Sequence, residues 1–314
     1  MVIIETERLT KSYGRSHALV DLTMRVEAGE VFGFLGPNGA GKTTVVKLLL
    51  GLARPTTGRG SVLGAPLGDR LARRQIGYLP ELFRYQPWLH AREVLELHVR
   101  LRGGAADRST RTLDRILEEV GLADRANDSV GGFSKGMQQR LGLGVALLGS
   151  PALIVLDEPT SALDPAGRAD VRAIIRRARE AGSTIFLNSH LLTEVERVCD
   201  RVAIVERGRV LASGRLADLL GEHRLRIRVT DLSPAAAARL DAFGPVRGPA
   251  DGWLTISPID PASIPAVVAA VVAAGGRVHA VDPSRASLED RYLELMAGRA
   301  VSTDPTGRDA GATT

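Results

Sequence analysis

The chain has 314 residues, which is more than one typical domain, and 44% of them are hydrophobic, enough for a sizeable core. Cys199 is the single cysteine, so a disulfide framework and a cysteine zinc site within one chain are excluded. The formal charge of +5 comes mainly from scattered arginines, without a clustered patch that would indicate nucleic acid or an anionic membrane as a partner.

The first informative segment is Gly36-Pro37-Asn38-Gly39-Ala40-Gly41-Lys42-Thr43. Residues 1–7 are expected to form a strand and lack the pattern of a secretion signal. The loop itself follows an apolar run of strand length, 30–35, and leads into a predicted helix over 44–50 that Gly51 ends. Strand, glycine-rich loop and helix in this order are the context that a phosphate-binding loop requires.

Glycines 36, 39 and 41 let successive backbone N–H groups and a helix N-terminus face one point, where an anionic phosphate is favoured. Lys42 is then predicted to reach the β- and γ-phosphates, and the Thr43 hydroxyl to bind Mg²⁺. A turn that binds nothing is disfavoured, because lysine and threonine stand at the required positions. The neighbouring residues expected to line the same phosphate site are Pro37, Asn38, Ala40 and Thr44.

Residues from about 91 to 150 show a helical pattern. The segments 92–98 and 113–120 place apolar residues at helical spacing, and Ser134 is a good N-cap for a helix that extends to Leu148. This part of the chain is therefore expected to be a helical subdomain.

Two later strands end in polar residues. Residues 153–156 are all apolar, which suits a strand buried on both faces of a parallel sheet, and such strands end where ligands bind. We assign Asp157, at the tip, to the Mg²⁺ shell and Glu158 to the polarisation of an attacking water as general base. A second apolar strand, 184–187, precedes His190.

These motifs, in this order, resemble the nucleotide-binding subunit of ATP-binding cassette (ABC) transporters over roughly residues 1–220. Phe133-Ser134-Lys135-Gly136-Met137 is similar to the signature motif of the family, with Lys135 and Met137 where glycine and glutamine are commoner. The resemblance implies an α/β P-loop NTPase fold in which two copies sandwich two ATP molecules. It also implies that Ser134 and Gly136 of one copy complete the nucleotide site of the other.

Three further positions carry over from the resemblance. Tyr13, expected just after the first strand, stands where the family stacks an aromatic ring on adenine. His190 resembles the switch histidine that contacts the γ-phosphate, and it is counted with Lys42 and Glu158 among the catalytic residues. Residues 161–164 resemble the loop that couples the two subunits, and Asp164-Pro165 also reads as N-cap and first position of the next helix.

Glu81 departs from the family pattern, which usually has a glutamine there that senses Mg²⁺. A glutamate still accepts a metal-bound water, but it adds charge beside Asp157 and Glu158 and couples their titration. Gln86 is an alternative for this position, although the register favours Glu81. Glu81, the variant signature and the C-terminal extension together resemble the ABC-2 type exporter branch.

Residues 221–298 are expected to form an accessory α+β domain. Strands are predicted at 225–229, 253–256 and 277–281, with a further short one at 245–247, and helices at 234–243 and 262–274; this order suggests a ferredoxin-like fold. A closing helix is predicted from Ser287 to Leu295, and residues 299–314 are expected to be a disordered tail. The most apolar run, 267–274, is far too short to span a membrane.

The resemblance predicts an ATPase that uses ATP and Mg²⁺, acts as a pair of copies and drives a separate ABC-2 type permease at the cytoplasmic face of the cell membrane. Tyr85, Trp88 and Leu89 lie where the family docks its permease, and they fit an interface or a local core equally well. A soluble ABC ATPase acting on ribosomes or nucleic acid is the alternative; it is disfavoured because the chain has one cassette and no sustained heptads. A regulatory module without turnover conflicts with the complete catalytic set. Homodimer and heterodimer both remain open.

Overall fold

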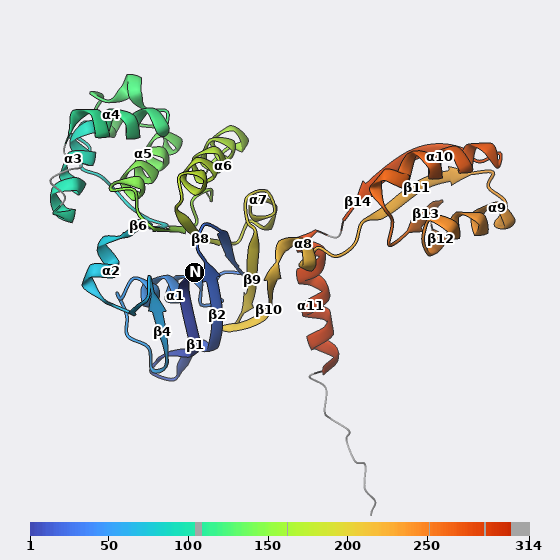
Figure 1. The fold of residues 1–314 in the computed structure, drawn as a ribbon, viewed down its shortest axis with the longest axis horizontal. Helices are drawn as coiled ribbons and strands as arrows, with labels where there is room; N and C mark the ends of the chain where they lie inside the picture. The colour runs from blue at the N-terminus through green and yellow to red at the C-terminus, as the bar shows by residue number, and fades with distance from the viewer. Residues whose placement is uncertain (104–108, 162, 251, 286, 303–314) are drawn as a thin grey trace, which may run out of the picture. The chain divides into compact units, whose positions relative to one another are not determined.

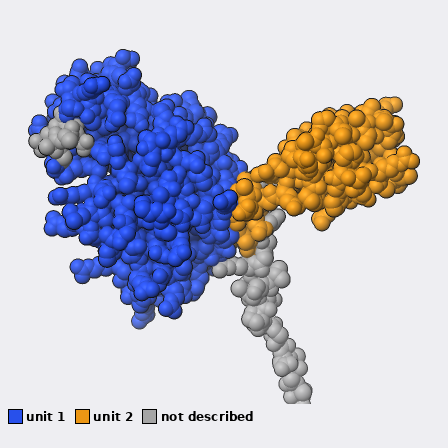
Figure 2. All heavy atoms as spheres, in the orientation of Figure 1, with its two compact units in different colours: residues 1–216 blue, residues 217–314 orange. Residues whose placement is uncertain are grey.

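The computed structural model describes residues 1–103, 109–161, 163–250, 252–285 and 287–302. The chain divides into two compact units, residues 1–216 and 217–314 (Figure 2). The division falls at helix α8 (Leu216–Leu219), close to residue 220, where the cassette is predicted to end.

A six-stranded sheet forms the centre of the first unit (Figure 1). Its strands pair in parallel, except that β10 runs antiparallel to β9. In spatial order they are β10 (Arg209–Arg215), β9 (Arg201–Glu206), β3 (Val31–Leu35), β8 (Thr184–Ser189), β7 (Leu153–Asp157) and β6 (Ile76–Leu79). Every residue of β3, β7 and β8 is buried, which confirms the burial on both faces predicted for residues 153–156 of β7.

A second sheet is antiparallel and has the order β2-β1-β4-β5. The N-terminal residues belong to it, as predicted, but β1 reaches Tyr13, so this tyrosine ends the strand instead of following it. Helix α1 (Lys42–Leu49) shares one apolar core with residues of both sheets, including Phe32, Phe34 and Phe186. The bounds of this sheet are β1 (Val2–Tyr13), β2 (Ser16–Glu27), β4 (Thr57–Val62) and β5 (Ala65–Pro66).

The predicted helical subdomain contains three α-helices that group together in Figure 1. They are α3 (Ala91–Arg102), α4 (Thr110–Glu119) and α5 (Lys135–Leu147), with short 3-10 turns η2 (Ala123–Arg125) and η3 (Val130–Gly132) between the last two. The other helices of this unit that lie outside the subdomain are α2 (Arg70–Arg74), α6 (Pro165–Glu180) and α7 (Leu192–Val195). Asp164 caps α6 and Pro165 takes its first position, as predicted.

The second unit has the ferredoxin-like order of elements that the sequence predicts, with an antiparallel sheet ordered β12-β13-β11-β14. The predicted helix over 234–243 divides into a short α-helix and a tighter 3-10 turn, which is a common way for a helix to end. The elements are β11 (Arg224–Thr230), α9 (Pro234–Ala238), η4 (Arg239–Phe243), β12 (Val246–Ala250), β13 (Trp253–Ile256), η5 (Pro261–Ser263), α10 (Ile264–Ala273), β14 (Arg277–Ser284) and α11 (Leu288–Ser302).

An apolar core belongs to the second unit itself, formed by alternate residues of β11 and β13 with Val267 and Val271 of α10. Within the described residues, we find no helix with the length and apolar character needed to cross a bilayer. Helix α11 continues to Ser302, and the rest of the predicted tail, residues 303–314, lies outside the described part of the chain.

Candidate nucleotide site

The glycine-rich loop connects β3 to α1, as the sequence predicts. A Cβ atom on Gly36 would lie 2.3 Å from the carbonyl oxygen of Val205, and one on Gly41 would lie 2.3 Å from that of Ala18. Gly41 also has a φ of +98°, so a side chain at this position is excluded by both space and backbone conformation. The tip of the loop, residues 37–39, is exposed to solvent, whereas Ala40 is buried.

Lys42, the first residue of α1, is only 7% exposed. Its ammonium group donates to the carbonyl oxygens of Gly36, at 2.9 Å, and Pro37, at 3.3 Å. It also lies 3.4 Å from Glu158 Oε1, so two motifs that are more than a hundred residues apart in the sequence meet here. Thr43 follows in the first turn of the helix and is exposed.

Asp157 ends β7 and is almost fully buried. The amide nitrogen of Asn188, on the neighbouring strand β8, donates to its carboxylate at 2.5 Å. Sequence reasoning did not select Asn188 as a site residue. The sequence did contain a signal, because Asn188 is a polar residue that directly follows the apolar stretch of its strand, and the structure buries it fully.

Burial is the main cause that raises the pKa of the Asp157 carboxyl above its ordinary value, and the negative charges of Glu81 and Glu158 add to it. The hydrogen bond from Asn188 and the charge of Lys42 act in the opposite direction. The ionised form of Asp157 therefore lowers the stability of the folded protein when no cation is bound.

We expect Asp157→Asn to stabilise the nucleotide-free protein at pH 8 and so to raise its apparent melting temperature, because each pH unit by which the pKa of Asp157 is raised corresponds to about 1.4 kcal/mol in the free energy of unfolding. Asparagine keeps the shape of the residue and still accepts from Asn188. The gain should be largest above the raised pKa of Asp157 and should shrink as the pH falls through it, because aspartic acid then also becomes neutral. Thermal unfolding of the parent and the variant at pH 8 and at successively lower pH measures this difference, and a variant that melts lower at pH 8 would contradict the prediction.

Glu158 directly follows β7 and is 6% exposed. Its φ is +52°, a left-handed conformation that is uncommon for a residue other than glycine and often occurs at functional sites. The backbone N–H of Glu158 donates to the carbonyl of Asn188 at 2.9 Å, which holds this turn against β8. Its Oε2 atom lies 2.8 Å from His190 Nδ1, and the His190 side chain is 41% exposed. Glu158 thus lies between a lysine and a histidine.

Glu81 lies beyond the end of β6, the strand next to β7. Its negative charge reaches the site, since it contributes to the raised pKa of Asp157. It also contributes, after burial and the charge of Asp157, to the pKa of Tyr78, which rises to about 12. At this edge of the sheet the negative charges of Glu81 and Glu158 therefore act on Asp157, and the positive charge of Lys42 opposes them.

The residues at this edge fit a magnesium ion. Mg²⁺ prefers oxygen ligands and is usually held by one or two carboxylates together with substrate phosphates, instead of an all-protein cage. Among the described residues, no cluster of three or more acidic, histidine or cysteine side chains forms a ready-made metal site. Asn188 Oδ1 is buried and has no hydrogen-bond partner in the described structure, which leaves a further oxygen beside Asp157.

Three predicted site residues lie away from this cluster. Tyr13 is half exposed, with the Lys11 ammonium 4.7 Å from the centre of its ring. Ser134 caps α5 by accepting from the Met137 N–H at 3.2 Å, and Gly136 lies in the first turn of that helix. The helical subdomain, and not the edge of the central sheet, therefore carries Ser134 and Gly136.

The sequence left open whether the aromatic residues before α3 are exposed, as in an interface, or packed in a local core. The structure shows one residue in each of these environments. Tyr85 packs against Phe83 and His98, with ring centres 5.3 Å and 5.7 Å away, and burial raises the pKa of its hydroxyl strongly. Tyr85 is thus part of a local core. Trp88, in contrast, is 72% exposed, and Leu89 is half-buried.

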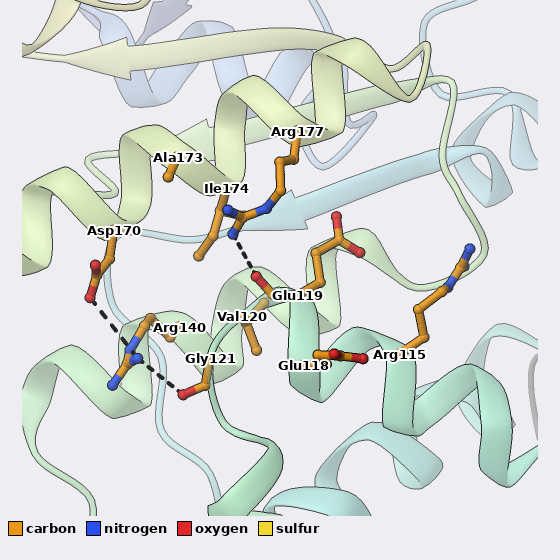
Figure 3. Close-up of a pocket in the computed structure, with 10 residues that line it drawn as sticks. All are labelled: Arg115, Glu118, Glu119, Val120, Gly121, Arg140, Asp170, Ala173, Ile174 and Arg177. Atoms are coloured by element: carbon orange, nitrogen blue, oxygen red, sulfur yellow. Dashed lines mark hydrogen bonds and ion pairs between the residues drawn. The ribbon is translucent and has the colours of Figure 1, made fainter.

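A polar hollow of about 590 Å³ lies elsewhere, among α4, α5 and α6 (Figure 3). Two of its arginines donate to backbone carbonyls, Arg177 to Glu119 at 2.7 Å and Arg140 to Gly121 at 3.1 Å. The nucleotide motifs do not line this hollow. We therefore place the candidate site at the sheet edge.

A parallel sheet with a glycine-rich loop after one strand, and acidic residues after the strands beyond it, defines a P-loop nucleotide hydrolase. Comparison with known proteins narrows this class. The family described as ABC transporter matches residues 19–161. An uncharacterized ABC transporter ATP-binding protein of Synechocystis sp. is 38% identical over 311 residues, which cover 96% of this chain and 86% of that protein. The chain therefore belongs to the ATP-binding proteins of ABC transporters, and it is an ATPase.

Two further relatives match a smaller share of the chain. The Nod factor export ATP-binding protein I of Rhizobium etli is 39% identical over 224 residues, 71% of each chain. The bacitracin transport ATP-binding protein BcrA of Bacillus licheniformis is 41% identical over 212 residues, 67% of this chain and 68% of that protein. A solved ATP-binding subunit of an ABC transporter, 34% identical, has a TM-score of 0.63 and covers 69% of this chain and 91% of its own.

Proposed function

We propose that the chain works as a dimer whose ATP binding and hydrolysis power a separate ABC-2 type membrane permease that exports its cargo. The observation that carries the chemistry is the position of Glu158, 3.4 Å from Lys42 and 2.8 Å from His190. Similarity to proteins named for Nod factor export and bacitracin transport supports an export role. We infer that the cargo is a drug, lipid, polysaccharide or similar molecule and that this subunit lies at the cytoplasmic face of the membrane.

In this proposal Lys42 leaves the carbonyls of Gly36 and Pro37 and binds the β- and γ-phosphates of ATP. Residues 36–44 surround these phosphates, and all of them except Pro37 have a backbone N–H to donate. Thr43, Asp157 and Glu81 hold Mg²⁺, which when bound neutralises developing charge on the phosphates. Tyr13 packs on the adenine.

Glu158 polarises the attacking water in this scheme, and departure of Lys42 toward the phosphates frees its carboxylate for that role. His190, held by Glu158, senses the γ-phosphate. Ser134 and Gly136 of the second copy complete the site from the opposite side, where the N-terminus of α5 favours an anion.

The exposed apolar residues Leu82 and Trp88 supply the permease contact in this proposal. They are 87% and 72% exposed, respectively, and lie in the segment between β6 and α3 that also carries Glu81. Large exposed aromatic and apolar side chains serve as anchors in protein interfaces. In this proposal Glu81, at the start of the same segment, connects the metal site to the permease contact along the chain.

Copurification from the native host tests the proposed function. The Glu158→Gln variant, tagged and solubilised from membranes in mild detergent with ATP, should recover a polytopic membrane protein, and recovery should fall when Trp88→Ala is added. The variant without ATP is the control. Recovery of only ribosomal or nucleic-acid-bound proteins would contradict the transporter role and support the alternative of a soluble ATPase.

We expect Glu81→Gln to raise the Mg²⁺ concentration needed for half-maximal ATPase activity by about fivefold, since removal of one nearby negative charge weakens cation binding by about 1 kcal/mol. Turnover at saturating Mg²⁺ should change less. A magnesium titration at fixed ATP measures both quantities, with Gln86→Glu as a matched control that should leave them unchanged. An unchanged magnesium requirement in Glu81→Gln would remove Glu81 from the metal site.

A further inference from the structure

Helix α6 carries three arginines at intervals of four residues: Arg168, Arg172 and Arg176. Residues four apart in an α-helix lie on the same side, one above the other. The three side chains therefore form a row along α6, which we call the arginine row. Each of them bonds to a residue outside the helix.

The N-terminal member of the row holds the loop that precedes the helix. Arg168 Nε donates to the carbonyl of Leu163 at 3.0 Å, and the side chain of Leu163 is buried. Asp164 caps the helix by accepting from the Gly167 N–H at 2.8 Å. The end of the predicted coupling loop, at Leu163 and Asp164, is thus fixed to the first turn of α6.

The other two members hold the segment that follows His190. Arg172 Nη1 lies 2.5 Å from Glu194 Oε2 on α7, and these side chains are only 15% and 9% exposed. Arg176 donates to the carbonyl of Arg197 at 3.0 Å. Separation of Arg172 from the buried carboxylate of Glu194 would be strongly destabilising. We therefore expect the pair to hold α7 against α6.

Backbone hydrogen bonds connect α7 to the residue that follows His190. The N–H groups of Glu194 and Val195 donate to the carbonyl of Leu191, the residue after His190, at 3.1 Å and 3.3 Å. His190 in turn contacts Glu158. A continuous set of contacts therefore runs from the loop at Leu163 through α6 and α7 to the histidine.

The opposite side of α6 faces the helical subdomain. Asp170, Ala173, Ile174 and Arg177 line the hollow shown in Figure 3 together with residues of α4 and α5. None of the arginine row lines that hollow. The two sides of α6 thus contact different parts of the protein. The arginine row lies on the side that contacts the segment after His190.

We propose that the arginine row couples the loop ending in Leu163 and Asp164 to His190, and that Arg172 and Glu194 are positioning residues for ATP hydrolysis. The inference rests on the proposed function, in which this loop meets the second copy and His190 senses the γ-phosphate. A displacement of the loop by the partner moves the start of α6, and the buried ion pair carries that displacement to α7. The position of His190 relative to the γ-phosphate then depends on the second copy.

The test uses the double variant Arg172→Met/Glu194→Met of the purified chain. Replacing both partners of a buried ion pair with apolar side chains is commonly tolerated by the fold, unlike removing one of them. We expect the turnover number to fall at least about tenfold and the cooperativity of turnover with respect to ATP to be lost, while the dissociation constant for ATP changes less than about twofold. Arg172→Lys, which keeps the charge without the planar guanidinium, should have intermediate turnover.

Arg179→Met is the matched control. Arg179 lies on the same side of α6, but its bonds are to other parts of the chain: it pairs with Asp200 at 2.9 Å and donates to the carbonyl of Gly29 at 3.2 Å. This variant should keep parental turnover and cooperativity. A purely structural role of the Arg172–Glu194 pair would change thermal stability without a loss of cooperativity, and Arg172→Lys provides the same readout if the double variant does not fold.

His190→Ala separates this inference from the proposed function. If the double variant hydrolyses ATP with parental turnover and cooperativity while His190→Ala is inactive, the arginine row has no coupling role and the proposed function stands. If His190→Ala also keeps full activity, the role of His190 is wrong and the inference falls with it.

Discussion

Glu158→Gln is expected to lower the turnover number for ATP by about 10²- to 10⁴-fold, the range that a positioned general base contributes. Glutamine has nearly the same size as glutamate and can still hydrogen-bond to His190, but it does not accept a proton from water. The site therefore keeps its shape, with Lys42 available for the phosphates. ATP binding should be retained. The ATP-bound dimer should accumulate, because the two copies separate only after ATP hydrolysis, which is blocked.

Two measurements check this prediction together. Steady-state phosphate release gives the turnover, and size-exclusion chromatography with and without ATP gives the fraction of dimer. Glu180→Gln, at the exposed end of α6, is a control that should behave as the parent in both. Full turnover in Glu158→Gln would show that Glu158 is not the base.

Lys42→Ala is expected to weaken ATP binding by about 100-fold, because charge-assisted hydrogen bonds to the phosphates contribute up to about 3 kcal/mol. The structure adds a second effect. Lys42 and Glu158 are 7% and 6% exposed, so removal of the lysine leaves a buried carboxylate with only His190 as an ionisable partner within contact distance in the described structure. The variant should therefore also unfold at lower temperature than the parent.

The double variant Lys42→Ala/Glu158→Gln separates the two effects. It should recover much of the lost thermal stability, because the buried charge of Glu158 is removed together with that of Lys42, but it should not recover ATP binding. Fluorescent-nucleotide titration and thermal unfolding of the parent, the two single variants and the double variant measure the coupling. Unchanged ATP affinity in Lys42→Ala would contradict the assigned phosphate role.

The sequence predicted the strands that carry the site, since apolar runs that end in glycine-rich or acidic segments are a local property. It did not predict which strands are neighbours. Strand β8 lies between β3 and β7, and this order puts Asn188 beside Asp157 and Glu158 beside both Lys42 and His190. Such pairings depend on the order of strands across the sheet, which no local pattern contains.

Side-chain direction in irregular segments was also beyond prediction. Tyr85 and Trp88 are three residues apart in a stretch without helical or strand periodicity, and one is packed among aromatic rings while the other is exposed. The pairing of Arg172 with Glu194 is a similar case, because it joins two helices whose separation along the chain says nothing about their contact. Helical spacing alone predicts that the three arginines lie on one side of α6, but it does not predict which residues that side contacts.

The separate apolar core of residues 217–314 has a consequence for how this protein can evolve. A unit that buries its own apolar side chains has the property expected of an independently folding domain, so substitutions within it should leave the stability of the cassette largely unaffected. Selection can then alter or exchange the second unit while the ATPase sequence stays under constraint. A lineage can in this way acquire a new accessory role without changes to its ATPase unit.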